Sequence, residues 1–199
     1  MITTIVFDIG GVLIGFDWES YSHSLFDKET AREVSAAMFE TGYWDELDVA
    51  VRTEEEILAS FYRARPAYRE QILEAFERVG ECVTRRDWVI PYIQDLKARG
   101  YRVLYLSNYS EHVMRANRAA LDFVPHMDGG VFSCDEHVIK PDPAIYRRLI
   151  AKYGLTPEEC LFIDDRQNNV DAARTLGMRA ILFENEGQMR SDVERECRG

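Results

Sequence analysis

The chain repeats one pattern along most of its length: a short apolar run, then a polar residue where the run stops, then a helical segment. Apolar runs rich in β-branched and aromatic residues are typical of buried strands. They lie at residues 3–7, 101–106, 130–133, 160–163 and 180–183. Because strands that alternate with helices pair in parallel, the pattern predicts an α/β fold with a Rossmann-like parallel sheet covered by helices on both faces.

The alternation is interrupted once, directly after the first strand. From Phe16 to about Val83 the apolar residues recur at three- and four-residue spacings, which predicts helices at 31–39, 54–62 and 68–79 and no strand. We therefore expect an α-helical insertion at 16–83 and a catalytic core made of 1–15 and 84–199. With 199 residues, 46% of them hydrophobic, the chain is long enough for one α/β core and a smaller unit.

Charge and cysteine content restrict the partners. The formal net charge of −11 repels nucleic acid and anionic membrane surfaces, so we expect neither as a partner, and an anionic substrate needs local cations. No stretch approaches the roughly 20 apolar residues of a membrane span, which favours a cytoplasmic location. The four cysteines lie far apart and are expected to be reduced thiols. Nothing in the sequence predicts the oligomeric state.

Polar residues follow the predicted strands at the ends where a parallel sheet binds ligands. Asp8 follows the first, Ser107 and Asn108 follow the second, and Asp164 and Asp165 follow the fourth, while Lys140 precedes a later helix. Taken singly, each has an ordinary explanation as a turn, capping or solvated residue. Together they place three carboxylates at one sheet edge, where they repel one another unless a cation lies between them, and hard oxygen ligands favour Mg²⁺.

Four segments at these positions resemble, in the same order, the motifs of the haloacid dehalogenase (HAD) superfamily. They are VFDIGGVL at 6–13, LYLSN at 104–108, IKPDPAIY at 139–146 and FIDDRQNNV at 162–170. In its local sequence the chain is most similar to the bacterial phosphatases that act on sugar phosphates such as α-D-glucose 1-phosphate. The resemblance implies a HAD-like core, and it implies that the insertion is a mobile cap that selects a small phosphorylated metabolite.

The resemblance also implies how the reaction proceeds. Asp8 is the nucleophile that attacks phosphorus and forms an aspartyl-phosphate, which water then hydrolyses. The expected Mg²⁺ ligands are Asp8, the backbone carbonyl of Gly10 and Asp165. Asp164 and Asn169 are similar to the family's supporting residues, which orient the metal, its waters or the loop.

The same resemblance assigns the phosphate-binding groups. Ser107 and the backbone amide of Asn108 are expected to donate hydrogen bonds to the phosphoryl oxygens. Lys140 is expected to stabilise both Asp8 and the charge that develops during the transfer.

The chain departs from the family at one catalytic position. Most phosphatases of the superfamily carry a second aspartate two residues after the nucleophile, which protonates the leaving group, but this chain has Gly10 there. Such proton transfer is worth about 10²- to 10⁴-fold in rate. We expect either a preference for leaving groups that need little protonation, such as an anomeric sugar oxygen, or a substitute acid. Asp17 is the nearest acidic candidate, although it also suits the cap of a helix.

Three other functions fit parts of the pattern. A receiver domain of two-component signalling uses similar residues, but there the acidic pair follows the first strand, whereas here the pair comes late. A dehalogenase of the same superfamily needs neither Mg²⁺ nor a proton donor, and metal-dependent release of phosphate rather than halide distinguishes the two enzymes. The third is a catalytically silent metal- or phosphate-binding regulatory protein.

Overall fold

The computed structural model describes residues 1–198 and is built around a five-stranded sheet. All strand pairs in this sheet are parallel, and the strand order is β5-β4-β1-β6-β7. The strands are β1 Thr4–Phe7, β4 Arg102–Ser107, β5 Gly130–Phe132, β6 Cys160–Asp164 and β7 Arg179–Leu182. The predicted α/β class with a parallel sheet is confirmed, and β1, which precedes the first candidate site residue, lies at the centre.

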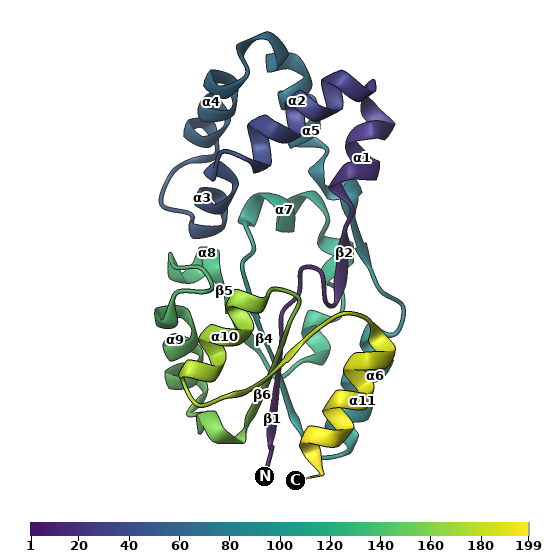
Figure 1. The fold of residues 1–199 in the computed structure, drawn as a ribbon, viewed down its shortest axis with the longest axis vertical. Coiled ribbons are helices and arrows are strands. Elements are labelled where there is room, and N and C mark those ends of the chain that lie inside the picture. Colours follow the sequence, from purple (N-terminus) through teal and green to yellow (C-terminus); the bar gives the residue numbers. More distant parts are fainter. Residues whose placement is uncertain (199) are drawn as a thin grey trace.

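Helices cover both faces of the sheet (Figure 1). They are α6 Val89–Ala98 and α11 Glu186–Cys197 on one face, and α9 Pro143–Tyr153 and α10 Gln167–Thr175 on the other. Alternate residues of β1 supply the two cores: Ile5 and Phe7 pack with the first pair of helices, and Val6 packs with the second. Since all of β1 is buried, its apolar run is continuous rather than alternating with polar residues.

Two short helices lie at the carboxyl edge of the sheet (Figure 1). These are α7 Glu111–Ala116 and α8 Ser133–Glu136. α7 ends at Ala116, because Asn117 leaves the helical conformation and its side chain accepts a hydrogen bond from the Ala120 N–H at 3.1 Å. A 3₁₀ turn follows at Arg118–Leu121.

Five helices form a separate layer beyond the carboxyl edge of the sheet, and we call them the helical unit (Figure 1). They are α1 Trp18–Leu25, α2 Lys28–Phe39, α3 Tyr43–Val49, α4 Glu54–Ala64 and α5 Arg69–Glu77. Their own core includes Ile57, Phe61 and Ile72, all fully buried. The sequence pattern missed α1 and α3, which have eight and seven residues, because two turns of helix are too short to show a clear period.

Two short strands, which the sequence analysis also missed, flank the helical unit. β2 Ile14–Phe16 and β3 Val83–Arg85 pair antiparallel and form a ribbon between the helical unit and the sheet. Three residues per strand leave too little periodicity to distinguish a strand from a loop. The boundaries given above for core and insertion stay a prediction.

Three cysteines, Cys82, Cys134 and Cys160, are buried as thiols. None of the helices in residues 1–198 combines the length and the apolar character needed to cross a bilayer. The start of β1 and the end of α11 lie at the edge of the sheet opposite to the helical unit (Figure 1). The helical unit faces the carboxyl edge of the sheet.

Adjacent residues of α5 test the core of the helical unit. Ile72 is fully buried, whereas Leu73 keeps 37% of its surface exposed. We expect Ile72→Ala to lower the free energy of unfolding by about 2–5 kcal/mol, because it removes buried methyl groups and leaves a cavity. Leu73→Ala, the control, is expected to change it by about 0.5 kcal/mol or less. Chemical denaturation measures both, and equal losses would contradict the packing described here.

Candidate active site

Three aspartate side chains meet at the carboxyl ends of the central strands. Asp8 directly follows β1, and Asp164 ends β6, the parallel neighbour of β1. The Asp8 N–H donates to the Ile163 carbonyl at 2.8 Å, which fixes the two strand ends side by side. One carboxylate oxygen each from Asp8, Asp164 and Asp165 lies within 4.8 Å of the other two. The structure thus brings together the carboxylates that the sequence placed at this edge.

A single buried lysine lies between two of these aspartates. Lys140 Nζ is 2.7 Å from Asp8 Oδ1 and 2.7 Å from Asp164 Oδ2, and its side chain is 1% exposed. An ammonium group buried without partners costs several kcal/mol, so the two carboxylates are what permits this position. One lysine opposite three carboxylates still leaves an excess of negative charge.

The protonation of Asp8 reflects this excess. Burial raises the pKa of Asp8 to about 7, repulsion from Asp164 acts in the same direction, and Lys140 opposes both. Burial alone would lower the pKa of Lys140, but its attraction to Asp8 and Asp164 outweighs burial and raises it. The lysine is therefore charged, and ionised Asp8 calls for further positive charge beside it.

The three carboxylates differ in how many hydrogen bonds they accept. Asp164 accepts from Lys140, from the Arg166 N–H at 2.9 Å, and from Asn169 Nδ2 at 2.9 and 3.1 Å. In contrast, Asp8 Oδ2 and the Asp165 carboxylate accept no side-chain or backbone hydrogen bond from another residue in 1–198. Asp164 is thus held by protein groups, while Asp8 and Asp165 keep oxygens free for a ligand.

Asn108 and Ser107 occupy different environments at the end of β4. The Asn108 side chain holds the Lys140 backbone through a reciprocal pair: Nδ2 donates to the Lys140 carbonyl at 3.0 Å, and Oδ1 accepts from the Lys140 N–H at 2.8 Å. Ser107 is fully buried, is not among the residues that line the cavity described below, and points its Oγ toward the Asn108 carbonyl at 3.4 Å. Its predicted contact with phosphate stays a prediction.

The two glycines after Asp8 have different steric requirements. Gly11 has φ +74°, and a Cβ there would lie 2.1 Å from Asp165 Oδ2, so only glycine lets the loop approach this carboxylate. A Cβ at Gly10 would meet no heavy atom within 4 Å. Gly10 lines the cavity, and the absence of a side chain there is not imposed by space.

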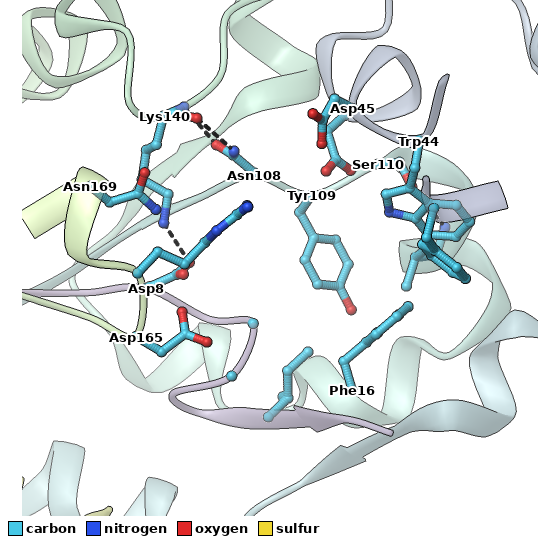
Figure 2. Close-up of a pocket in the computed structure, with 17 residues that line it drawn as sticks. Asp8, Phe16, Trp44, Asp45, Asn108, Tyr109, Ser110, Lys140, Asp165 and Asn169 are labelled. Atoms are coloured by element: carbon cyan, nitrogen blue, oxygen red, sulfur yellow. Dashed lines mark hydrogen bonds and ion pairs between the residues drawn. The ribbon is translucent and has the colours of Figure 1, made fainter. Parts of the chain in front are cut away.

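A cavity of about 450 Å³ separates this cluster from the helical unit. Its wall on the sheet side includes Asp8, Asn108, Lys140 and Asp165. Figure 2 shows Trp44 and Asp45 of α3 across the open space from Asp8, with Tyr109 between them. Phe16, Phe39 and Asp48 complete the wall of the cavity near the helical unit. The site is therefore a chamber. Its charged floor consists of Asp8, Lys140 and Asp165, and the opposite wall combines aromatic rings with two carboxylates.

Sequence reasoning missed the wall formed by the helical unit. Trp44, Asp45 and Asp48 lie on α3, a helix that the pattern did not predict, so nothing identified the face they share. Asp17 is exposed, is absent from the cavity wall, and caps α1 by accepting from the Ser20 N–H at 3.0 Å. The structure supports the capping role for Asp17.

Fold and site together define a hydrolase class in which a parallel sheet presents an aspartate cluster and a lysine beneath a helical unit. A family model for haloacid dehalogenase-like hydrolases matches residues 2–177. The chain belongs to the haloacid dehalogenase-like hydrolases and is an enzyme of that family. The resemblance of its four motifs to this superfamily is confirmed.

Individual relatives agree with this assignment. The chain is 28% identical to a phosphatase of Mycobacterium tuberculosis, over 98% of this chain and 93% of that protein. A HAD-like family hydrolase from Porphyromonas gingivalis has a similar structure, with a TM-score of 0.77, 25% identity, and coverage of 100% of this chain and 99% of that one. A HAD family enzyme of Bacteroides thetaiotaomicron, solved with magnesium and inorganic phosphate, has a TM-score of 0.70 at 18% identity, covering 95% and 99%.

Replacement of Lys140 tests the charge balance at the floor of the site. Without the ammonium group, Lys140→Met leaves two buried carboxylates unneutralised, so in the presence of a metal chelator we expect the free energy of unfolding at pH 8 to fall by about 3–5 kcal/mol. Without Lys140, the pKa of Asp8 in the folded protein rises further above its value in the unfolded chain. The folded form then binds more protons than the unfolded form, so this variant recovers stability as the pH falls from 8 toward 5. Urea denaturation at both pH values measures this, and a deficit independent of pH would contradict the ion-pair arrangement.

Proposed function

We propose that this hydrolase is a Mg²⁺-dependent phosphatase that cleaves a small phosphomonoester through an aspartyl-phosphate on Asp8. One observation carries the proposal: Asp8 holds one oxygen against Lys140 at 2.7 Å and leaves the other free toward the cavity. A carboxylate in this position is restrained and has one oxygen available for attack. The mycobacterial phosphatase and the Bacteroides enzyme with magnesium and phosphate support the same activity.

The residues present fit a magnesium ion. Three carboxylate oxygens, one each from Asp8, Asp164 and Asp165, lie within 4.8 Å of one another, and the Asp165 carboxylate accepts no hydrogen bond from another residue in 1–198. Hard oxygen donors of this kind are the ligands that Mg²⁺ prefers. We assign Asp8, the Gly10 carbonyl and Asp165 as its ligands. Bound there, the ion neutralises charge between the nucleophile and the phosphate dianion.

Side chains and backbone groups of the protein carry out the other steps of phosphoryl transfer. Asp8 Oδ2 attacks phosphorus and forms the acyl phosphate as the ester P–O bond breaks and its oxygen departs with the alcohol, while Lys140 stabilises the other oxygen of Asp8 and the charge on the phosphoryl group. Asp164, held by Asn169, fixes Lys140 in place rather than touching the substrate. The Asn108 backbone amide and Ser107 are assigned to the phosphoryl oxygens, and water finally hydrolyses the acyl phosphate.

The cavity wall favours a sugar phosphate as the substrate. The rings of Phe16, Trp44 and Tyr109 offer flat apolar faces, and Asp45 offers a hydrogen-bond acceptor for hydroxyl groups. Sugars present C–H faces and hydroxyl edges that match such a wall. Together with the glycine at position 10, this supports an anomeric sugar phosphate, as in the phosphatases of α-D-glucose 1-phosphate that the motifs resemble.

We also propose that the helical unit acts as a cap spanning residues 16–83, over a core of 1–15 and 84–199. Polar contacts dock it on the core: His112 of α7 contacts Glu54 of α4 at 3.0 Å and the Phe76 carbonyl at 2.8 Å. Its ring also stacks on Phe76 with centroids 3.8 Å apart. The chamber beneath the cap suits a small metabolite, and further closure of such a cap would exclude bulk water.

A phosphate-release screen tests the reaction. With Mg²⁺, we expect the wild-type protein to release inorganic phosphate from small phosphoesters, with the highest kcat/KM for an anomeric sugar phosphate. Chelation of the metal and the Asp8→Asn variant are each expected to reduce release to background, because one removes the neutralising charge and the other the nucleophile. Halide release from a 2-haloacid without metal would indicate a dehalogenase, and inactivity on a broad panel a regulatory protein.

Replacement of Asp165 tests the metal site separately from the nucleophile. Asp165→Asn weakens a ligand but leaves Asp8 and Lys140 intact, so we expect the Mg²⁺ concentration for half-maximal activity to rise by at least about 10-fold. Asp171→Asn, an exposed position on α10, is the control and is expected to leave this concentration unchanged. Magnesium titration of the phosphatase rate makes the comparison, and equal behaviour of the two variants would contradict the ligand assignment.

A further inference from the structure

The chamber contains a buried acid that no step above uses. Asp48 lies on α3 with only 9% of its surface exposed, and it lines the same cavity as Asp8. Within residues 1–198 its carboxyl group forms no hydrogen bond and no salt bridge. A buried carboxyl group without a partner is costly, so its presence in a substrate chamber calls for a chemical explanation.

The backbone of Asp48 is fixed to the loop that would bind phosphate. The Asp48 carbonyl accepts a hydrogen bond from Ser133 Oγ at 2.6 Å, and the same oxygen of Ser133 accepts from the Tyr109 N–H at 3.0 Å. Tyr109 directly follows Asn108, which in turn holds Lys140. Two hydrogen bonds through a fully buried serine therefore set the position of Asp48 relative to the charged floor.

Asp48 also lies on the side where a leaving group must depart. Asp8 belongs to the sheet edge, and α3 closes the opposite wall, as the labelled Asp45 of the same helix shows in Figure 2. In-line attack by Asp8 directs the departing oxygen away from the sheet and toward the helical unit. Water that later hydrolyses the acyl phosphate enters from that same direction.

The surroundings keep this acid protonated. Burial raises the pKa of Asp48 to about 8, with further contributions from the neighbouring charges of Asp45 and Asp8, while Lys140 and Arg166 act in the opposite direction. At neutral pH the group is therefore a carboxylic acid, which donates a hydrogen bond as well as accepting one. A proton donor for an alkoxide needs this form.

We propose that Asp48 is the general acid and base that replaces the aspartate missing at position 10, an inference that rests on the proposed phosphatase function. As the bond from Asp8 Oδ2 to phosphorus forms and the ester bond breaks, the Asp48 proton passes to the departing oxygen and yields the alcohol. Asp48 is then a carboxylate. It takes a proton from the water that attacks the acyl phosphate, releasing inorganic phosphate and restoring the free carboxylate of Asp8.

The other acidic side chains near the chamber fit this role less well. Asp45 is exposed and lies in the first turn of α3, so it stays solvated. Asp17 caps α1 outside the chamber. Asp48 alone among these three combines burial, access to the cavity and a backbone position tied to the phosphate loop.

Two esters of similar shape but with different leaving groups test whether Asp48 transfers a proton to the departing oxygen. 4-Nitrophenyl phosphate releases a weakly basic phenolate that departs without a proton, whereas benzyl phosphate releases a strongly basic alkoxide that needs one. With Mg²⁺ present, we expect Asp48→Asn to lower kcat/KM for benzyl phosphate by about 10²- to 10⁴-fold and for 4-nitrophenyl phosphate by less than about 10-fold. The ratio kcat/KM covers the steps through departure of the leaving group, so later hydrolysis does not obscure the comparison.

The variant contains its own folding control, because activity retained on 4-nitrophenyl phosphate demonstrates an intact site. Asp17→Asn, at the exposed cap of α1 outside the chamber, is the control and is expected to leave kcat/KM for both esters unchanged. Equal losses on the two esters in Asp48→Asn, or no loss on either, would overturn the assignment. Failure of the wild-type protein to release phosphate from both esters would instead refute the proposed phosphatase function itself.

A second variant tests whether an aspartate at position 10, where most phosphatases of the superfamily carry one, can replace the acid lost in Asp48→Asn. Since a Cβ at Gly10 meets no heavy atom within 4 Å, Gly10→Asp has room for its side chain. In the Asp48→Asn background we expect Gly10→Asp to recover at least about 10-fold in kcat/KM for benzyl phosphate, relative to the single variant. No recovery there, together with recovery on 4-nitrophenyl phosphate, would mean that Asp48 acts through general electrostatics rather than proton transfer.

Discussion

The buried ammonium group of Lys140 joins three distant parts of the chain at one point. Its contacts of 2.7 Å reach Asp8 after β1 and Asp164 at the end of β6, while Asn108 after β4 holds its backbone. Each carboxylate alone at this depth would be costly to ionise, and the lysine alone would be costly to charge. The sheet order, which places β1 between β4 and β6, brings these groups together, so topology and site chemistry depend on each other.

Much of this arrangement could be predicted from sequence because it is encoded locally. Continuous apolar runs marked the parallel strands, and the polar residues that follow them marked the ligand-binding edge. Asp8, Lys140 and Asp165 line the cavity as those positions suggested. Ser107 is fully buried, because the end of a strand fixes the position of a residue but not the direction of its side chain. The roles of these residues remain those we propose.

The wall of the chamber that α3 forms, opposite the sheet, could not be predicted from the sequence. α3 has seven residues between Gly42 and Ala50, both in left-handed conformations, and the Asp48 carbonyl within it accepts a hydrogen bond from Ser133 Oγ. A helix this short shows no clear periodicity in its apolar residues. Aspartate is usually exposed, so nothing in the sequence indicated that Asp48 is buried. Sequence reasoning therefore located the charged residues at the sheet edge but not the wall of the chamber that α3 provides.

The ribbon of β2 and β3 connects the helical unit to the floor over a very short distance. Only residues 9–13 separate Asp8 from Ile14 at the start of β2, and the turn is closed by hydrogen bonds from the Leu13 and Ile14 N–H groups to the Ile9 carbonyl. A rotation of the helical unit about this ribbon would therefore move the backbone that carries Asp8. Under the function that we propose, opening of the chamber would therefore also displace Asp8 from the position that the reaction requires.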